Sequence, residues 1–339
     1  MKHRIALIGF GNVGQGLAEI LLNKEKELKK EYGYEYSVVG ISDVAWGTAY
    51  NPDGLDIPSL LADVKEKQKF SKDAKNWDSL KLIKESNANV VCELAFTNLE
   101  TGDPAISHCK AAFETGKHVV TSNKGPAALA YRELKEAADK KGLKFLIEGT
   151  VMSGTPVINL MEGPLAGCTI SAARGIVNGT TNYILTQMEG GMSYGDALKK
   201  AQELGYAEAD PTGDVEGYDA RGKVTILANV VMGTSLKISD VACQGITKIT
   251  QEDIATAKAE NCRWKLIGSV KKEGEKIIAS VAPEKLPLTH PLAGVMGATN
   301  AITFSTDLLG DVSIVGPGAG RTQTGFSILT DLLHIHRNG

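Results

Sequence analysis

The chain has 339 residues, which is enough for two domains of ordinary size. Hydrophobic residues make up 42% of it and charged residues 23%, a composition that argues against disordered and fibrous proteins. The formal net charge of −3 and the pI near 6.1 argue against a basic surface for nucleic acid or an anionic membrane.

The sequence does not predict export or membrane insertion. Residues 1–9 place charges before an apolar run, but that run is too short for a signal peptide and leads into a glycine-rich turn. No stretch approaches the ~18 apolar residues of a membrane span. The five cysteines are scattered and never spaced C-x-x-C, which argues against a disulfide framework or a zinc site. We therefore expect a soluble, cytoplasmic protein.

Residues 1–150 alternate apolar runs with amphipathic stretches. A long helix is expected up to about residue 32. Another helix begins at Asp103-Pro104, which supply a capping side chain and a first-turn proline, and ends at Gly116. A third runs from Pro126 to Gly142. The predicted strands cover residues 4–8, 36–42, 89–95, 118–122 and 144–148. Strands that alternate with helices predict an α/β domain with a doubly wound parallel sheet.

Residues 151–315 have a different pattern and predict a second, α+β domain. Thr181 is the expected cap of a helix that runs to Met188, and Ser193 with Asp196 resembles a capping box for the next helix. A strongly apolar helix is expected over about residues 216–232. Predicted strands cover residues 169–177, 263–271, 276–282, 300–306 and 311–315. Residues 316–339, a glycine turn and an apolar helix, are expected to return to the first domain.

A glycine-rich turn between the first strand and the first helix predicts dinucleotide binding. The pattern Gly9-x-Gly11-x-x-Gly14 permits a tight turn, close approach of the backbone to a pyrophosphate, and tight packing of helix on sheet. The start of the helix then faces the phosphates with its N–H groups and its favourable dipole. A Rossmann-type domain is therefore expected, with cofactor contacts from the whole turn: Gly9, Gly11, Asn12, Val13 and Gly14.

Asp43, at the end of the second predicted strand, bears on the choice between NAD and NADP. A carboxylate at this point binds the ribose hydroxyls of NAD and repels the 2′-phosphate of NADP. Its distance from Gly14 exceeds the usual ~20 residues, so the first helix must be unusually long. Alternatively, Ser42 and Asp43 form only a turn at the strand end. Both interpretations stay open, and with them the choice of cofactor.

The segment from Ala201 to Lys223 predicts a second site. Asp219 and Lys223 are four residues apart, so their side chains emerge on one face of the apolar helix. An exposed salt bridge would use the same spacing, but this helix is too apolar for a solvated element. Further carboxylates precede the helix at its positive end: Glu208, Asp210 and Asp214. Charge at this density in an apolar setting indicates a functional site.

The same segment resembles the signature of the homoserine dehydrogenases without a break in spacing. Other stretches resemble that family too, so the resemblance covers nearly the whole chain; they are residues 97–100, 116–124, 148–156, 175–184 and 318–320. The departures are Cys92-Glu93 in a strand that often carries other residues, Ser122 in place of a frequent alanine, and Arg321 in place of a small residue. The chain ends at Gly339, where many relatives carry a regulatory domain, so a short form is expected.

The resemblance implies an NAD(P)-dependent interconversion of L-homoserine and L-aspartate 4-semialdehyde. Lys223 would transfer the proton, with Lys124 as the rival for that role, and Asp219 would orient the substrate. Glu208 would hold the substrate amino group, and Asp214 would join it in binding substrate. Further contacts to the cofactor would come from Thr97, Asn98, Ser122, Lys124 and Gly318. The domain of residues 1–150, with 316–339, would bind the dinucleotide, and that of residues 151–315 would carry substrate binding, catalysis and dimerisation.

The resemblance also implies a monovalent cation, Na⁺ or K⁺. One carboxylate and several backbone carbonyls would bind it, which suits a hard cation; the matching residues are Glu148, Val151, Ser153 and Thr155. The alternative is a strand-to-helix turn, punctuated by glycine and proline, that needs no ion.

Two other functions compete with this prediction. Aspartate-semialdehyde dehydrogenase shares the fold class and the metabolite but needs an activated cysteine near a histidine. Cys92 and Cys109 lie in segments that we expect to be buried, without an obvious partner. A non-catalytic nucleotide sensor would keep the glycine turn but would not need Glu208, Asp219 and Lys223. We therefore expect an enzyme that acts as a homodimer on a small molecule, with neither nucleic acid nor membrane as a partner.

Overall fold

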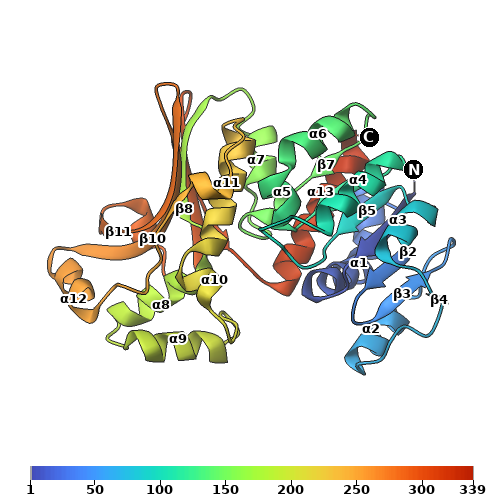
Figure 1. The fold of residues 1–339 in the computed structure, drawn as a ribbon, viewed down its shortest axis with the longest axis horizontal. Coiled ribbons are helices and arrows are strands. Elements are labelled where there is room, and N and C mark those ends of the chain that lie inside the picture. Colours follow the sequence, from blue (N-terminus) through green and yellow to red (C-terminus); the bar gives the residue numbers. More distant parts are fainter. Residues whose placement is uncertain (1, 339) are drawn as a thin grey trace. The chain divides into compact units, whose positions relative to one another are not determined.

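The computed structural model describes residues 2–338, which form two compact units (Figure 1). The first unit contains the chain up to Gly154 and again from Gly320 onward, and the second is Thr155–Ala319. Each junction lies four residues beyond the position expected from the sequence, after 150 and after 315. Among the described residues, no helix is both long enough and apolar enough to cross a membrane.

The first unit is built on a seven-stranded sheet in the order β4-β3-β2-β1-β5-β6-β7. Its strands are β1 (His3–Ile8), β2 (Tyr36–Asp43), β3 (Gly47–Tyr50), β4 (Ala74–Lys75), β5 (Val90–Glu93), β6 (His118–Thr121) and β7 (Phe145–Leu146). The strands from β2 to β7 in this order are parallel, and β3 and β4 extend the edge antiparallel. The strand order reverses between β1 and β5, and ligands of such sheets bind beyond the carboxyl ends of strands at that point.

The helices of this unit differ in part from the prediction. They are α1 (Asn12–Tyr32), α2 (Ile57–Lys65), α3 (Ser79–Glu85), α4 (Ala105–Glu114), α5 (Lys124–Leu129), α6 (Tyr131–Asp139) and α13 (Arg321–Asn338). The single helix expected from Pro126 to Gly142 is two helices, because Ala130 adopts a non-helical φ of −139°. The strand expected over 144–148 ends at Leu146, and a 3₁₀ turn, η1 (Glu148–Thr150), follows. The backbone N–H of Glu148 donates to Asp331 at 3.0 Å instead of to a strand.

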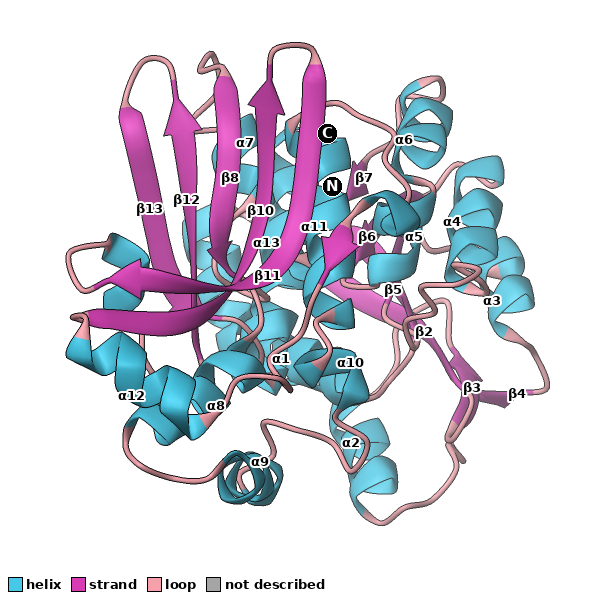
Figure 2. Cartoon of the chain, turned by 60° about the vertical axis from the view of Figure 1, so that its left-hand side comes forward, coloured by secondary structure: helices cyan, strands magenta, loops and turns pink. Residues whose placement is uncertain are grey.

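The second unit is built on a six-stranded sheet in the order β13-β12-β8-β10-β11-β9 (Figure 2). Its strands are β8 (Ile170–Ile176), β9 (Ala242–Cys243), β10 (Cys262–Glu273), β11 (Lys276–Pro287), β12 (Thr299–Thr306) and β13 (Gly310–Pro317). Neighbouring strands are antiparallel except β9 and β11. This architecture confirms the predicted α+β class of the second part of the chain.

Side-chain caps define where some of the helices of this unit begin. They are α7 (Ile158–Glu162), α8 (Gly179–Glu189), α9 (Tyr194–Glu203), α10 (Thr212–Val215), α11 (Tyr218–Val231) and α12 (Gln251–Ala259), with short 3₁₀ turns η2 (Ile238–Asp240) and η3 (Pro291–Gly294). The prediction of Thr181 as the cap of α8 is wrong. The cap is Asn178, whose side-chain oxygen accepts from the Thr181 N–H at 2.9 Å. Ser193 caps α9 as expected, by accepting from the Asp196 N–H at 3.1 Å.

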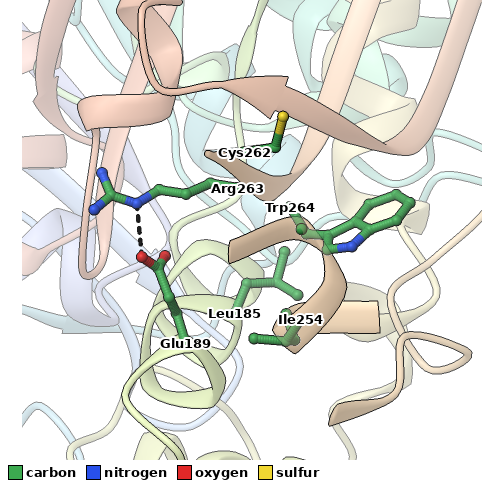
Figure 3. A pocket seen from close by; sticks show the side chains of 7 residues that line it. Leu185, Glu189, Ile254, Cys262, Arg263 and Trp264 are labelled. Atoms are coloured by element: carbon green, nitrogen blue, oxygen red, sulfur yellow. Dashed lines mark hydrogen bonds and ion pairs between the residues drawn. The ribbon is translucent and has the colours of Figure 1, made fainter. Parts of the chain in front are cut away.

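A small hollow lies where α8, α12 and the start of β10 meet (Figure 3). It is lined by Leu185, Glu189, Ile254, Ala257, Cys262, Arg263 and Trp264. Arg263 and Glu189 pair at 2.8 Å, and Arg263 also donates to the Ala293 carbonyl at 3.2 Å. The charged groups of this hollow therefore satisfy each other, and it offers little to a polar substrate.

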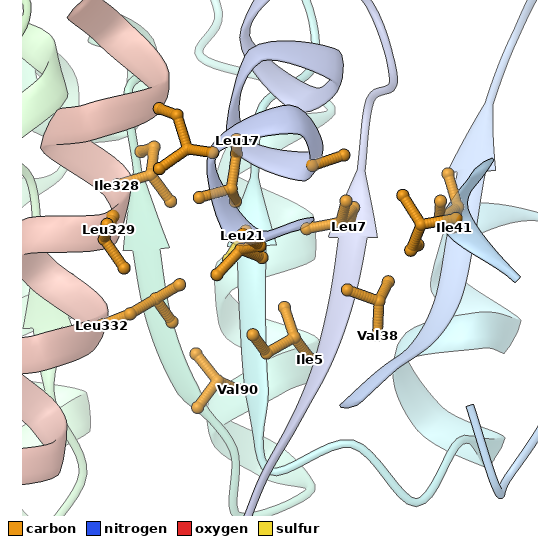
Figure 4. Packing of buried hydrophobic residues seen from close by; sticks show 14 of the residues in the cluster. Ile5, Leu7, Leu17, Leu21, Val38, Ile41, Val90, Ile328, Leu329 and Leu332 are labelled. Carbon is orange, nitrogen blue, oxygen red and sulfur yellow. The ribbon is translucent and has the colours of Figure 1, made fainter. Parts of the chain in front are cut away.

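The core of the first unit joins the two ends of the chain. Leu17 and Leu21 of α1 pack between strands of the sheet and α13, which contributes Ile328, Leu329 and Leu332 (Figure 4). Two glycines let the helices approach closely. A Cβ at Gly16 would lie 2.3 Å from the Arg321 carbonyl oxygen, and one at Gly325 would lie 2.6 Å from the Leu17 nitrogen. The close packing of α13 fixes α1, and with it the glycine turn at the start of α1.

Candidate functional site

The three motif glycines that precede and open α1 are glycines for three different reasons. Gly9 has φ +98°, and a Cβ there would lie 2.5 Å from the Leu94 carbonyl oxygen. A Cβ at Gly14 would lie 2.5 Å from the oxygen of Gly9, so it would collide with the turn itself. A Cβ at Gly11 would meet nothing within 4 Å. Packing thus requires glycine at positions 9 and 14. At position 11, glycine leaves open the space through which a phosphate group can approach the protein backbone.

The start of α1 has the electrostatics of an anion site. Gly11 is its N-cap and supplies no capping side chain, and the first turn carries no acidic residue. The N–H groups at Asn12 and Val13 therefore face the ligand side of the turn together with the positive end of a 21-residue helix. Such a helix start binds phosphate groups well.

Asp43 contacts the glycine turn directly. One of its carboxylate oxygens accepts from the Phe10 N–H at 2.7 Å, and the other accepts from the Ala45 N–H at 2.8 Å. The strand-end turn that the sequence left as an alternative is therefore present. Because each carboxylate oxygen can accept more than one hydrogen bond, Asp43 can hold the turn and still bind a ribose hydroxyl.

The loops after β5 and β6 bring the expected nicotinamide-side residues to one edge of the sheet. The Asn98 side chain accepts from the N–H groups of Glu100 and Thr101 at 2.9 and 3.1 Å. Asn123 connects the two loops by donating to the carbonyls of Ala95 and Phe96. Thr97 follows β5, while Ser122 and Lys124 follow β6, all partly buried. The structure thus places these residues at the carboxyl ends of parallel strands.

A second site lies in the other unit, around Lys223. This lysine is 8% exposed, in the middle of the buried face of α11. Its Nζ donates to Asp219 Oδ2 at 2.6 Å and to the Val177 carbonyl at 2.8 Å. The spacing of four residues does place both side chains on one face, as the sequence predicted. The pair is mostly shielded from water, so it is not the exposed salt bridge that the same spacing could have formed.

Asn178 ties two aspartates to this pair. Its side-chain nitrogen donates to Asp214 Oδ1 at 2.7 Å and to Asp219 Oδ2 at 3.0 Å. Burial and the nearby Asp219 carboxylate raise the pKa of Asp214 above its usual value, and the hydrogen bond from Asn178 partly offsets this. The result is a cluster of one ammonium, two carboxylates and one amide, which we call the Lys223 cluster: Asn178, Asp214, Asp219 and Lys223.

The other acidic residues of the segment lie outside the Lys223 cluster. Glu208 is exposed to solvent, and Asp210 is exposed too and accepts from the Thr212 N–H at 3.1 Å. Glu208 and Asp210 therefore lie outside the apolar surroundings that the sequence predicted for the charges of this segment, because both are exposed. Glu208 is placed by Gln202, whose amide donates to the backbone carbonyl of Glu208 at 3.0 Å.

Two buried polar residues of the second unit were not singled out from the sequence. Asn178 carried a weak signal, since asparagine before Gly179 is a common helix cap. Nothing in the sequence signals Lys265 on β10, because the residues around it have the pattern of an ordinary strand. It is 1% exposed and donates to Asn182 Oδ1 at 2.9 Å and to the Val295 carbonyl at 2.5 Å.

The loop that follows β7 has an unusual backbone. Met152 and Ser153 both have positive φ, 58° and 56°, although neither is glycine. Ser153 is held by a hydrogen bond between its hydroxyl and that of Thr324 at 2.6 Å. Glu148 and Val151 are buried in this loop, and Thr155 follows it as the first residue of the second unit. Successive residues in this conformation are costly and are typical of ligand-binding loops.

Comparison with known proteins identifies the family. The family model described as "Homoserine dehydrogenase, NAD binding domain" matches residues 9–148, and the model "Homoserine dehydrogenase" matches residues 156–333. The chain belongs to the homoserine dehydrogenase family. It is 46% identical to the NAD(+)-dependent homoserine dehydrogenase of Pseudomonas canavaninivorans, over 99% of this chain and 97% of the relative.

Further relatives agree along the whole length. The homoserine dehydrogenase of Methanocaldococcus jannaschii is 45% identical over 98% of each chain. The structure of a hyperthermophilic archaeal homoserine dehydrogenase in complex with NADPH has a TM-score of 0.84 and 32% identity, and covers 100% of this chain and 99% of that one. The predicted family, fold class and activity are thereby confirmed, and the chain is an NAD(P)-dependent oxidoreductase.

The buried lysine at position 265 predicts a pH dependence of stability. Burial lowers its pKa from 10.5 to about 8, so the folded state disfavours the protonated form. The resulting destabilisation is complete below pH 8 and disappears as the pH rises toward 10.5. We expect the stability of Lys265→Met relative to the wild type to be higher at pH 7 than at pH 10, by on the order of 2 kcal/mol, because only the wild type carries this pH-dependent penalty. Urea denaturation at both pH values measures it; a difference independent of pH would contradict the assignment.

Proposed function

We propose that this member of the family interconverts L-homoserine and L-aspartate 4-semialdehyde with Lys223 as the proton-transfer group. The observation that carries the proposal is the position of Lys223, buried in an apolar helix yet hydrogen-bonded to Asp219 and to the Val177 carbonyl. The reaction belongs to the biosynthesis of threonine, methionine and isoleucine. An assay of homoserine oxidation with NAD⁺ and NADP⁺ side by side tests the activity directly.

The chemistry of a lysine suits both directions. The bound dinucleotide supplies the hydride in aldehyde reduction and accepts it in alcohol oxidation. When the aldehyde is reduced, Lys223 gives a proton from its Nζ to the oxygen of the forming alkoxide. When homoserine is oxidised, neutral Lys223 takes the hydroxyl proton. Asp219, at 2.6 Å, keeps the amine aimed in one direction during both steps.

The carboxylates near Lys223 fit the substrate amino group. Asp219 already contacts Lys223, so its second role is to orient the substrate, while Asp214 adds negative charge beside it. Glu208 is exposed, and we propose that it binds the ammonium group of homoserine directly. Lys124, which follows β6, is the rival proton donor and otherwise contacts the cofactor. On this proposal the second unit binds substrate and carries out proton transfer.

The first unit would hold the dinucleotide. The Gly9–Gly14 turn and the start of α1 would bind the pyrophosphate through Gly11, Asn12 and Val13, and Thr97, Asn98 and Ser122 would face the nicotinamide. We propose that Gly318, in the turn after β13, also contacts the cofactor. NAD is the favoured form, because Asp43 repels a 2′-phosphate and residues 43–47 contain no Lys or Arg to bind one.

We further propose that the loop of residues 148–155 binds Na⁺ or K⁺. The residue types fit a hard cation: Glu148 carries a carboxylate, and the positive-φ turn at Met152 and Ser153 would let the backbone carbonyls of Val151, Ser153 and Thr155 act as ligands. No cluster of three or more His, Cys, Asp or Glu that could hold a metal occurs among residues 2–338. A cation held mainly by carbonyls is compatible with that composition.

We also propose a homodimer formed through the second unit. Several large apolar side chains on the strands and turns of its sheet are exposed, which favours an interface between copies of the chain; they are Ile278, Leu308, Leu309 and Val315. Light scattering of the purified protein gives the oligomeric state. The five free cysteines fit the proposed cytoplasmic location, which cell fractionation tests.

The two cysteines considered as nucleophiles for aspartate-semialdehyde dehydrogenase chemistry are poorly suited to it. That reaction needs a reactive thiolate. Cys92 and Cys109 are fully buried, and burial raises the pKa of both thiols. His108 lies next to Cys109 in sequence, but its Nδ1 is 3.2 Å from the buried Glu93 carboxylate.

Cofactor choice gives one prediction. Asp43→Ala should raise the ratio of kcat/KM with NADP⁺ to kcat/KM with NAD⁺ by about tenfold, because the repulsive carboxylate is gone. The kcat/KM with NAD⁺ should fall as well, since Phe10 loses the acceptor for its N–H. Asp53→Ala, at an exposed acid of the same unit, is the control and should change neither value. A wild-type kcat/KM with NADP⁺ that is a hundredfold above that with NAD⁺ would contradict this assignment of Asp43.

The proton-transfer role gives another. Lys223→Ala should lower kcat by roughly 10²–10⁴-fold, the usual contribution of general acid–base catalysis. The Kd for NAD⁺ should change little, because the glycine turn is in the other unit. Lys223→Arg should restore little activity, since a guanidinium does not give up its proton. If Lys223→Ala keeps most of its kcat while Lys124→Ala loses it, proton transfer belongs to Lys124.

The cation proposal predicts a dependence on the salt present. Replacing Na⁺ and K⁺ by tetramethylammonium at constant ionic strength should lower the Tm by several degrees, because a ligand of the folded state is lost. Glu148→Gln should remove most of this response. An identical Tm of the wild type in NaCl, KCl and tetramethylammonium chloride would show that the loop needs no ion. Calorimetry with intact protein measures the change.

A further inference from the structure

Asn300 on β12 is a fully buried asparagine whose amide has no hydrogen-bond partner. It is 0% exposed, and both its Nδ2 and its Oδ1 lack a partner among the described residues. Burying an amide without hydrogen bonds is unfavourable, and native proteins rarely do so. Such exceptions are expected mainly where function requires them.

A second asparagine of the same unit shows the ordinary solution. Asn182 on α8 is also 0% exposed, but its Nδ2 donates to the carbonyls of Val295, Gly297 and Thr299. Its Oδ1 accepts from Lys265. The two residues are alike in type and burial and opposite in hydrogen bonding, so they form a matched pair.

The position of Asn300 connects two segments that matter for the reaction. A Cβ at Gly318 would lie 2.0 Å from Asn300 Nδ2, so the amide packs directly on the backbone of the glycine turn after β13. A Cβ at Gly179, the first residue of α8, would lie 3.2 Å from Asn300 Oδ1. Gly179 follows Asn178, which donates to Asp214 and Asp219 of the Lys223 cluster. The amide thus lies between the glycine turn and the start of α8, whose cap Asn178 belongs to that cluster.

Both segments can supply the missing partners after a small shift. The start of α8 carries backbone N–H groups that no preceding turn of the helix satisfies, and the side chain of Asn178 caps that of Thr181. The turn at 316–320 is anchored at Pro317, whose carbonyl accepts from Thr155 at 2.9 Å, and Gly318 follows it. Asn300 Oδ1 is therefore close to the start of α8, where such donors lie, and its Nδ2 is close to Gly318, in a turn that carries backbone carbonyls.

We propose that Asn300 is a positioning residue for homoserine, whose amide forms its hydrogen bonds to the glycine turn and to the first turn of α8 only when ligands are bound. Substrate binding then sets Gly318 and Asn178 in their reactive arrangement. This inference rests on the proposed homoserine dehydrogenase activity. It assigns to Asn300 a contribution to the KM for homoserine and to ligand-induced stabilisation, and none to the stability of the ligand-free fold.

The test compares Asn300→Leu with Asn182→Leu. Without ligands, Asn300→Leu should have the Tm of the wild type or a higher one, because no hydrogen bond is lost, whereas Asn182→Leu should melt at least ~5 °C lower. Asn300→Leu should raise the KM for homoserine at least tenfold and change kcat by less than about threefold. The rise in Tm caused by the non-reacting pair NADH and L-homoserine should fall to less than half of the wild-type value.

A second variant controls for the possibility that Asn300→Leu fails to fold. Asn300→Ala removes the amide without added bulk against Gly318, and it should show the same rise in KM and the same reduced response to NADH and L-homoserine. Wild-type KM values in both folded variants would overturn the inference. So would an unliganded Tm of both Asn300 variants as low as that of Asn182→Leu, which indicates a structural role. A wild-type chain that does not oxidise homoserine would instead refute the proposed function.

Discussion

The ion pair between Lys223 and Asp219 is the interaction on which the second unit depends. A lysine on the buried face of an apolar helix must be compensated locally, because an unpaired charge there is strongly unfavourable. The compensation comes from three directions: the Asp219 carboxylate, the Val177 carbonyl at the end of β8, and Asn178, which holds Asp219 and Asp214. The end of β8, the start of α8 and α11 are thereby fixed to one another.

In the first unit the corresponding constraint is steric. Gly9 and Gly14 are excluded from carrying a side chain by the Leu94 and Gly9 backbone, whereas Gly11 meets nothing. Asp43 then holds the turn through the Phe10 N–H, so one carboxylate connects the shape of the turn with the choice of cofactor. These contacts within the protein hold the shape of the turn, which reduces the ordering that binding must impose.

Much of this could be predicted from local sequence. The strands around Ile8 and Ser42, the glycine turn, and the face shared by Asp219 and Lys223 follow from hydrophobic pattern, glycine spacing and helical periodicity. What could not be predicted depends on partners distant in sequence. Glu148 is not part of the strand because its N–H donates to the Asp331 carboxylate. Lys265 can be buried because the Asn182 side chain and the Val295 carbonyl accept hydrogen bonds from its Nζ. No local pattern records contacts of that range.

The path of the chain through the first unit has a consequence for biosynthesis. The last helix, α13, supplies Ile328, Leu329 and Leu332 to a core that otherwise comes from the first 154 residues. A ribosome therefore produces the whole intervening segment Thr155–Ala319 before the amino-terminal core can close. The intervening unit can fold while the apolar face of the earlier strands is still uncovered. During this period the nascent chain is exposed to aggregation. Chaperone demand during synthesis should accordingly concentrate on the amino-terminal sheet.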